Sequence, residues 1–565
     1  MDIEKMLKKC GDFGRYQFML MGLFCIINVL ASLNYYSQTI ISFVPEHWCY
    51  SEKLSNLTYD EIKQIYSTYE RPSCSILNET ENLYLLEAES VAQLPYSFDY
   101  LRSDDDDTKF TADGGCEKWI YKLDYEYRSM TSELNWVCES AWKSSLGQSL
   151  FFIGSVIGSL VFGVWADRIG RLHVLIISNL MAMFGNGATI FATNVTAFAF
   201  CRFIAGLATD TNFVMMYILV MEYIRPSMRT FGLNLCIGIF YCIGSMISPW
   251  IAVAVGDWKT FLLVTSLPVI VVPLMYFLVE ESALWLISMN DIDAAVNCFV
   301  RVAKFNKNPL SESDIDDFRK TIVETKNTEK RNTSTLFGLF KTPRLRRLTL
   351  ILFFKSMVIT LCYDAISRNV EGLGLSPFIM FSLSATAIFP ACVVLLLLQD
   401  VIGRKAMASS SLLISGIFTA STGFLIAYQH GVSEPALLVT LAIIGRFGVT
   451  VAYNSGAQYA TELIPTCVRG QGVAAVHVAG YALTFFSSYI LYLSNIFKPL
   501  PALVLGGLSL MGSVLVLFLP ETLNRTIPST LEDGERFGKG ERFYEFSCFE
   551  KKSRITDSTD VLTDN

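Results

Sequence analysis

Apolar residues in this chain are gathered into long blocks, and polar stretches separate one block from the next. Each block has about 20 residues, which is the length a helix needs to cross about 30 Å of hydrocarbon. Backbone groups in lipid must be satisfied within their own segment, so blocks of this kind form helices. The pattern predicts twelve membrane-spanning helices, at residues 18–44, 144–166, 173–193, 196–220, 231–255, 259–279, 347–369, 377–398, 406–427, 436–460, 470–492 and 500–519.

Basic residues mark one end of alternate helices. Short loops rich in Lys and Arg stay on the cytoplasmic side of a membrane. The loops after the second, fourth, eighth and tenth predicted helices carry Arg168 and Arg171, Arg225 and Arg229, Arg404 and Lys405, and Arg469. The alternate short loops carry few basic residues. We therefore expect a multi-pass plasma-membrane protein with both termini in the cytoplasm.

Two polar insertions complete the domain organisation. We expect a cytoplasmic N-terminus at 1–17, an N-terminal six-helix bundle at 18–279, a cytoplasmic linker at 280–346, a C-terminal six-helix bundle at 347–519 and a cytoplasmic tail at 520–565. The linker segments 291–306 and 311–330 have the apolar spacing of amphipathic helices. The predicted fold class is an all-α membrane protein of twelve helices in two six-helix bundles.

The first insertion, residues 45–143, is a long loop on the outer side. It contains Cys49, Cys74, Cys116 and Cys138. An even number of cysteines in an oxidising compartment predicts two disulfides, although four cysteines allow three pairings. The sequons at Asn56 and Asn78 are glycosylation sites that this orientation exposes.

The two halves of the chain repeat one another. Three motifs recur at offsets of 233, 244 and 240 residues: Asp167, Gly170 and Arg171 with Asp400, Gly403 and Arg404; Arg202 with Arg446; and Glu222 and Arg229 with Glu462 and Arg469. Near-constant offsets indicate two copies of one six-helix unit. Paired halves of this kind suit alternating access around a substrate site near the membrane midplane.

Charged residues of both signs cluster at the predicted cytoplasmic helix ends. Charge of one sign would be enough to set topology, so we interpret these clusters as ion pairs that close an inner gate; topology alone is the alternative. The predicted gating residues are Asp167, Arg168, Arg171, Glu222, Arg229, Asp400, Arg404, Glu462 and Arg469.

The pattern of apolar blocks does not explain Asp210, because it places this carboxylate inside a predicted membrane helix. It lies in the fourth predicted helix, twelve residues before Glu222 and therefore about 18 Å from the inner face. A carboxylate at that depth costs roughly 2.5–3.5 kcal/mol on insertion scales, so it should face a wet cavity or a cation. Phe213 and Tyr217 share its helical face, and a carboxylate beside aromatic rings is suited to an amine. A structural salt bridge to a helix neighbour, such as Arg202 or Arg446, is the alternative.

Other polar residues within predicted helices are weaker candidates. By symmetry with Asp210, Asn454 should face the same cavity, with Gln458 one turn further on. Tyr363 and Asp364 lie near the outer mouth, where Asp364 is either an outer-gate or recruiting charge or a surface carboxylate at a helix end. A polar patch at Asn34 and Tyr35 is candidate cavity lining. Lys355 should snorkel to the interface, and His477 is more typical of a packing residue than of a proton-coupling one.

The composition excludes other classes of protein. Of 565 residues, 52% are hydrophobic and 17% charged, and the chain contains four histidines. The sequence has no Ser-His-Asp or metal-ligand spacing. We therefore expect no enzymatic activity, no cofactor, no metal site and no nucleic-acid partner, and we expect a monomer in the lipid bilayer.

Several of these segments resemble a known family. The stretch "CEKWIYKLDYEYRSMTSELNWVCESAWKSSLGQ" running into "GVWADRIGR", together with "PEHWC", "EESALWL", "GRFGVT" and "LPETLNRTIPSTLED", is similar to the organic cation/carnitine transporter family of the major facilitator superfamily. The resemblance covers nearly the whole chain and is nearest to the carnitine-type and carcinine/β-alanine-type branches. The large cysteine-bearing loop is its most specific element.

The resemblance implies further details. It implies the disulfides Cys49–Cys116 and Cys74–Cys138, and aromatic cavity lining at Phe213 and Tyr217. Family members usually have six cysteines in the loop, and here there are four.

One position departs from the family pattern. In the eleventh helix the family usually places an Asp or an Arg where this chain has Tyr481, and cation transporters tend to have a lysine at the position of Asp210. Together, the two differences are what would result if a charge had moved across the cavity, from the position of Tyr481 to that of Asp210.

These observations predict a transporter of small organic cations or zwitterions that works by alternating access. Carcinine, carnitine, β-alanine and related amines are the candidate substrates, and the sequence does not identify a coupling ion. An organic anion exchanger of the same family, or a non-transporting receptor on a transporter scaffold, are the alternatives.

Overall fold

The computed structural model describes residues 3–11, 13–50, 54, 57–68, 74, 116, 118–224, 235–329, 336–428, 435–541 and 545–546. The predicted gating residue Arg229 and both sequons, at Asn56 and Asn78, lie outside the described residues.

Twelve helices within the described ranges are long and apolar enough to cross a membrane, as the blocks predicted. Several consist of two to four consecutive segments. In the first half they are α2 (Arg15–Ile41), α6 (Trp142–Ile169) preceded by η3 (Cys138–Ser140), α7 (Arg171–Thr189), α8 (Val195–Tyr223), η4 with α10 (Ile237–Tyr241, Cys242–Val255), and α11 with η5 and α12 (Trp258–Ser266, Leu267–Leu274, Met275–Leu278). In the second half they are α16 (Pro343–Arg368), α17 with α18 (Pro377–Thr386, Ile388–Ile402), α19 (Arg404–Tyr428), α20 (Pro435–Leu463), η7, α21, α22 and η8 (Thr466–Val468, Arg469–Thr484, Ser487–Tyr492, Leu493–Asn495), and α23 (Leu500–Leu517).

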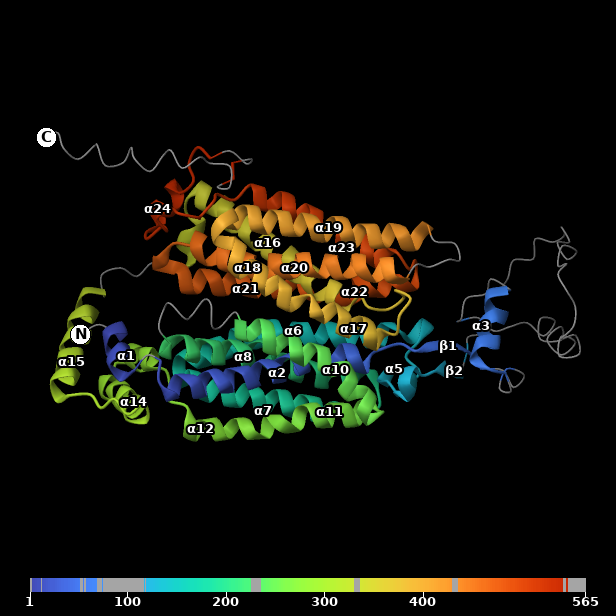
Figure 1. Cartoon of the computed structure of the whole chain (residues 1–565), viewed down its shortest axis with the longest axis horizontal. Helices are drawn as coiled ribbons and strands as arrows, with labels where there is room; N and C mark the ends of the chain where they lie inside the picture. Colours follow the sequence, from blue (N-terminus) through green and yellow to red (C-terminus); the bar gives the residue numbers. More distant parts are fainter. Residues whose placement is uncertain are drawn as a thin grey trace, which may run out of the picture.

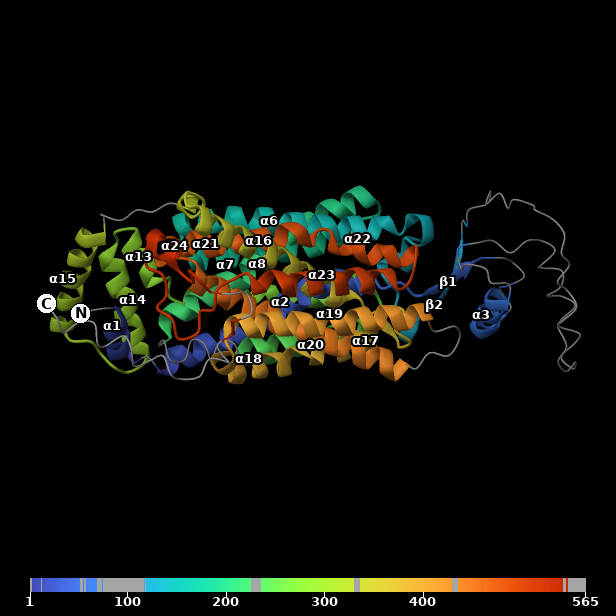
Figure 2. The same cartoon turned by 90° about the horizontal axis from the view of Figure 1, so that it is seen from above.

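The helices form two bundles that lie side by side, one from each half of the chain (Figures 1 and 2). In the N-terminal bundle, α8 packs against both α6 and α7; in the C-terminal bundle, α19 packs against both α20 and α23. The pairs α7–α8 and α19–α20 are equivalent in the repeat, so the sequence repeat corresponds to a repeat of helix packing.

Shorter elements cover the two ends of the bundles (Figure 1). One end, here called the terminal face, carries α1 (Ile3–Cys10), α13 (Ala283–Ser288), α14 (Ile292–Phe305), α15 (Glu312–Glu329), η6 (Leu336–Phe340) and α24 (Leu531–Arg536). The opposite end, the loop face, carries β1 (Glu46–Cys49), α3 (Tyr59–Thr68), β2 (Trp119–Lys122), η2 (Asp124–Glu126) and α5 (Met130–Glu133). The amphipathic linker segments are the helices α14 and α15.

The loop-face insertion is held together by a strand pair and two disulfides. β1 and β2 are antiparallel, with Glu46 opposite Lys122 and Cys49 opposite Trp119. The structure contains the disulfides Cys49–Cys116 and Cys74–Cys138, which is the pairing that the family resemblance implies.

Buried apolar side chains show where the bundles meet. One cluster belongs to the N-terminal bundle and the helices on its terminal face, and another belongs to the C-terminal bundle near the same face. A third cluster contains residues of both bundles, among them Tyr36 and Phe43 of the first half and Phe378 and Phe381 of the second. The rings of Phe43 and Phe378 lie 5.0 Å apart, close to the loop face. This conformation is therefore closed at the loop face.

Candidate functional site

Asp210 lies near the middle of α8, a helix of 29 residues that runs from the loop face to the terminal face. The helix begins after Asn194, whose side-chain Oδ1 accepts a hydrogen bond of 2.8 Å from the backbone N–H of Ala197. Capping fixes where the helix starts, and the rise of about 1.5 Å per residue then places Asp210 close to mid-depth.

Asp210 is paired with a histidine from the other bundle. His477 Nε2, on α21, lies 3.0 Å from Asp210 Oδ2 and 3.1 Å from Oδ1. Ser159 of α6 donates a third hydrogen bond of 3.1 Å to Oδ2. A carboxylate only accepts hydrogen bonds, so Nε2 carries the proton. The alternative of an ion pair with a neighbouring helix therefore involves His477 and not the two arginines named as examples, because Arg202 and Arg446 bind other groups.

Aromatic side chains surround this pair. Tyr481, the residue at the family's charged position, has its ring 5.0 Å from that of His477. Tyr453 and Tyr481 both lie near enough to interact with the charge of Asp210. Tyr453 also stacks on Tyr363, with the ring centroids 4.5 Å apart. These rings come from α16, α20 and α21, so the C-terminal bundle supplies an aromatic wall opposite Asp210.

Phe213 and Tyr217 form a second aromatic group on the helix of Asp210. Their rings stack at a centroid distance of 6.0 Å, and Phe24 of α2 lies 6.0 Å from Phe213 and 6.3 Å from Tyr217. Both remain partly exposed. The two rings thus pack together and against Phe24 of α2, and their role as cavity lining stays a prediction.

Three other candidates are tied to neighbours that limit their role. Asn34 accepts a hydrogen bond of 2.7 Å from Asn186 and donates one of 3.4 Å to Thr209. Its amide therefore faces the interior of the N-terminal bundle. Gln458 donates to Glu462 at 3.2 Å, which directs it toward the terminal face. Asn454 contacts Cys392 Sγ at 3.9 Å within its own bundle.

Asp364 is fully buried, which excludes its interpretation as a surface carboxylate at a helix end. Arg368 Nε donates to Asp364 Oδ1 at 2.7 Å. Tyr35 of the first bundle donates to Oδ1 and Ser487 donates to Oδ2, both at 2.7 Å. Arg368 also contacts Thr39 and the backbone carbonyl of Tyr35. Asp364 and Tyr35 thus belong to a polar cluster that joins the two bundles near the loop face.

Most of the predicted gating residues that the structure describes form contacts within their own bundle in this conformation. Arg171 Nη2 lies 3.1 Å from Asp167 Oδ1, and Arg404 Nη1 lies 2.9 Å from Asp400 Oδ1. Arg404 Nε also pairs with Glu462 at 3.0 Å. Arg469 donates to the Ile464 carbonyl, Arg168 is exposed, and Glu222 accepts a hydrogen bond from Ser282.

Sequence reasoning missed two carboxylates in these clusters. Glu281 Oε1 accepts the backbone N–H of Arg171 at 2.9 Å, and Glu521 Oε1 accepts that of Arg404 at 3.0 Å. Each carboxylate thus caps the first turn of a membrane helix, where the helix dipole favours negative charge. Glu281 and Glu521 are 240 residues apart. The same offset relates Glu222 to Glu462, so the repeat held the signal that would have found them.

Three further cations are buried with neutral partners. Arg202 contacts Asn186 and Gln38, and Arg446 donates to the Tyr363 carbonyl and the Tyr36 hydroxyl. Lys355 is 1% exposed and donates to the Gly456 carbonyl at 2.8 Å. The expectation that Lys355 snorkels is wrong, because its ammonium group lies between α16 and α20.

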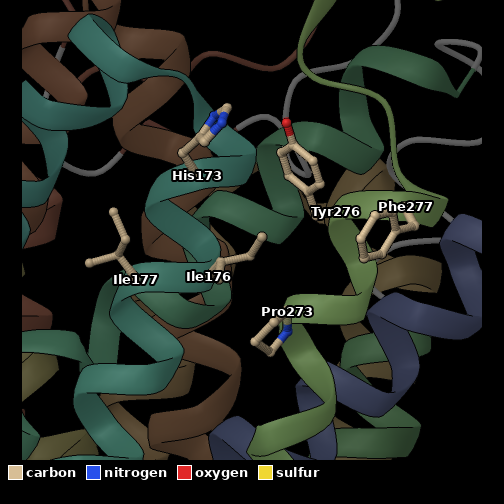
Figure 3. Close-up of a pocket in the computed structure, with 6 residues that line it drawn as sticks. All are labelled: His173, Ile176, Ile177, Pro273, Tyr276 and Phe277. Atoms are coloured by element: carbon tan, nitrogen blue, oxygen red, sulfur yellow. The ribbon is translucent and has the colours of Figure 1, made fainter.

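A separate groove of about 330 Å³ lies between α7 and the segments η5 and α12 (Figure 3). Its lining shares no residue with the surroundings of Asp210 and is almost entirely apolar: His173, Ile176, Ile177, Pro273, Tyr276 and Phe277. An apolar surface on the flank of one bundle is suited to hydrocarbon and not to a charged substrate.

One group in the described ranges has the side chains of a metal site. His47, Cys74 and Cys138 lie close together. The two cysteines are joined in a disulfide, and a disulfide sulfur is not a thiolate ligand. These residues therefore stabilise the loop and do not form a metal site.

Two six-helix bundles with a polar site at mid-depth are typical of one class of membrane protein. Comparison with known proteins identifies this class. The sequence profile of the Major Facilitator Superfamily matches residues 139–488. The chain therefore belongs to this superfamily of membrane transporters, and it is not an enzyme. The proton:xylose symporter XylE of E. coli, bound to 6-bromo-6-deoxy-D-glucose, has the same fold, with a TM-score of 0.55 at 16% identity over 93% of this chain and 100% of that chain.

Curated relatives confirm the resemblance to the organic cation/carnitine transporter family. The organic cation transporter protein of Drosophila melanogaster is 26% identical over 95% of this chain and 95% of its own length. The human organic cation/carnitine transporter 2 is 29% identical over 73% of both chains.

Proposed function

We propose that this chain carries small organic cations or zwitterions across the plasma membrane, with Asp210 as the counter-ion for the ammonium group. Candidate substrates are carcinine, carnitine, β-alanine and related amines. Two relatives are named for organic cations or carnitine, which supports this substrate class.

The observation that carries the proposal is the position of Asp210. Its side chain is 10% exposed, and that of its partner His477 is 40% exposed, so the carboxylate is largely buried while its partner can be reached. An ammonium group 4 Å from a carboxylate gains about 4 kcal/mol at an effective dielectric constant near 20. Faces of Tyr453, Tyr481 and Phe213 can add cation–π attraction. A site of this kind prefers a positively charged head.

The arrangement of the two bundles supports alternating access. Contacts that join the bundles lie at mid-depth and toward the loop face, for example Asp210–His477 and Tyr35–Asp364. The charged clusters of the terminal face connect helices within single bundles. Opening at the loop face therefore requires the Tyr35–Asp364 cluster to separate, while the terminal-face clusters are free to meet across the bundles.

The second candidate is an organic anion exchanger, which needs a basic cavity. Arg202, Arg446 and Lys355 are the buried cations that favour it. Their exposed fractions are 0%, 2% and 1%, and their donors are directed at protein carbonyl, amide and hydroxyl oxygens. They are less suited to a mobile anion than Asp210 is to a mobile cation. Membership of a transporter superfamily favours transport over the receptor alternative.

Uptake by purified protein in liposomes tests the substrate class. Labelled carcinine, carnitine, β-alanine, tetraethylammonium and an organic anion of similar size are compared, with protein-free liposomes as the control. We expect saturable uptake of the compounds that carry an ammonium group and none of the anion. Uptake of the anion alone would establish the exchanger instead. Monodisperse, heat-stable protein that transports none of them would contradict the proposal.

A further inference from the structure

The pair formed by Asp210 and His477 joins the two bundles at mid-depth. Asp210 lies on α8 of the first bundle and His477 on α21 of the second, 267 residues apart in sequence. Nε2 reaches both carboxylate oxygens, at 3.0 and 3.1 Å. A substrate ammonium group that binds Asp210 must therefore compete with the imidazole for the same two oxygen atoms.

Several uncharged groups surround Asp210 and His477, and none of them exchanges a proton near neutral pH as readily as the imidazole of His477 does. From α6 comes the hydroxyl of Ser159, and from α20 and α21 come the phenols of Tyr453 and Tyr481. Helix α16 packs on α21 beside the histidine through Ser356, which donates to the Val476 carbonyl. Hydroxyls and phenols keep their protons near neutral pH, whereas an imidazole changes charge between about pH 5 and 8.

Charged groups elsewhere in the interior are engaged by other partners. On α16, Lys355 donates to the carbonyl of Gly456, one turn of α20 beyond Tyr453. Asp364 is neutralised by Arg368. Asp210 is thus the carboxylate that pairs with His477, and its negative charge is balanced by whichever cation lies beside it.

We propose that Asp210 and His477 form one site that holds either a proton or a substrate ammonium group, so that the protein exchanges organic cations for protons. This inference rests on the proposed function and adds the identity of the coupling ion.

Charge balance defines the cycle. Without substrate, the carboxylate of Asp210 and the imidazolium of His477 are together neutral. A substrate cation that binds Asp210 displaces the imidazolium, and the Nε2 proton passes to water on the side from which the substrate came. After the bundles reorient, the substrate leaves on the other side, and Nε2 takes a proton from water there. Each cycle moves one cation in one direction and one proton in the other, with no net charge transferred.

Proton movement in liposomes tests this exchange directly. Tetraethylammonium is added outside liposomes that hold the wild-type protein and an entrapped pH-sensitive dye, with the membrane potential clamped by potassium and valinomycin. We expect the lumen to become more alkaline as the cation enters. An acidic lumen should accelerate uptake about tenfold, and a change of the clamped potential should leave the rate unchanged.

A histidine variant locates the proton site. His477→Gln keeps a hydrogen-bond donor but cannot carry a proton charge, so its uptake should lose the lumen pH change and become dependent on the potential. The matched control is His173→Gln, which removes an imidazole that also faces a carboxylate, that of Glu281 at 3.2 Å, but at the terminal face. We expect this variant to keep proton exchange.

The outcomes separate the two proposals. Wild-type uptake of tetraethylammonium that leaves lumen pH unchanged and follows the potential would overturn proton exchange while the proposed function stands. Proton exchange that persists in His477→Gln would place the proton site elsewhere and also overturn the inference. Absence of cation uptake by folded wild-type protein would overturn the proposed function itself.

Discussion

At the residue scale, two glycines explain why the same motif stands at the terminal face of both bundles. Gly170 and Gly403 have φ angles of +101° and +97°, a region that side chains with a Cβ avoid. A Cβ at Gly170 would lie 2.3 Å from Glu281 Oε2, and one at Gly403 would lie 2.5 Å from Glu521 Oε2. Glycine therefore allows both the reversal between helices and the approach of the capping carboxylate.

The variant Gly170→Ala should destabilise the protein. It combines an unfavourable φ with a clash against Glu281, and strain of this kind costs on the order of 1–3 kcal/mol. We expect a clear fall in the melting temperature of the detergent-solubilised protein. Gly163→Ala is the control, since a Cβ there meets nothing within 4 Å, and it should be neutral or slightly stabilising. Equal melting temperatures for the two variants would contradict this account.

At the element scale, a buried ion pair connects α16 to helices of both bundles. Asp364 and Arg368 lie one turn apart on α16, with side chains 0% and 3% exposed. Their remaining hydrogen bonds reach Tyr35 and Thr39 of α2 and Ser487 of α22. Because an unpaired buried charge is strongly unfavourable, this cluster makes the loop-face closure depend on both members of the pair.

Variants of this pair should be strongly non-additive. Asp364→Asn leaves Arg368 buried without its counter-charge and should cost about 3–5 kcal/mol. Adding Arg368→Gln removes the orphaned charge, so the double variant should be more stable than the sum of the single losses predicts. Thermal unfolding of all four proteins measures the coupling. Additivity within about 0.5 kcal/mol would mean that the pair does not act as a unit.

The sequence predicted the elements better than the contacts between them. Block length and basic loops sufficed for the twelve helices, and constant offsets sufficed for the two bundles. Depth along a helix follows from residue counting, so Asp210 was found near mid-depth. Neither the block lengths nor the repeat offsets show which faces of two helices meet across the interface between the bundles. The pairing of Asp210 with His477 could therefore not be predicted. The pairing of Asp364 with Arg368 is different, because the two residues lie four positions apart on one helix, and that spacing was enough to predict it.

At the scale of the whole molecule, buried side chains of both bundles close the loop face, whereas the charged clusters described at the terminal face connect helices within single bundles. Rings of both halves meet near the loop face, including Tyr36 with Phe381 at 5.0 Å. The terminal face carries the linker helices α14 and α15 and the C-terminal helix α24 (Figure 2). Two rigid units with interchangeable contacts at their ends are what alternating access requires.

Orientation in the membrane can be tested through the loop insertion. If the loop face is extracellular, Asn56 and Asn78 carry glycans, and Asn→Gln changes at both should increase electrophoretic mobility to that of the enzymatically deglycosylated protein. An N-terminal epitope tag should then be accessible to antibody only in permeabilised cells. Staining of intact cells through that tag would reverse the predicted orientation.

The most direct test of the central claim compares a cation with its uncharged counterpart. Competition against tetraethylammonium uptake is measured for choline and for the isostere in which a quaternary carbon replaces the nitrogen, using the wild type, Asp210→Glu and Asp210→Asn. We expect the wild type to prefer choline by at least about tenfold, which corresponds to 1.4 kcal/mol, Asp210→Glu to keep part of this preference, and Asp210→Asn to lose it. An unchanged preference for choline in folded Asp210→Asn protein would show that Asp210 is not the counter-ion.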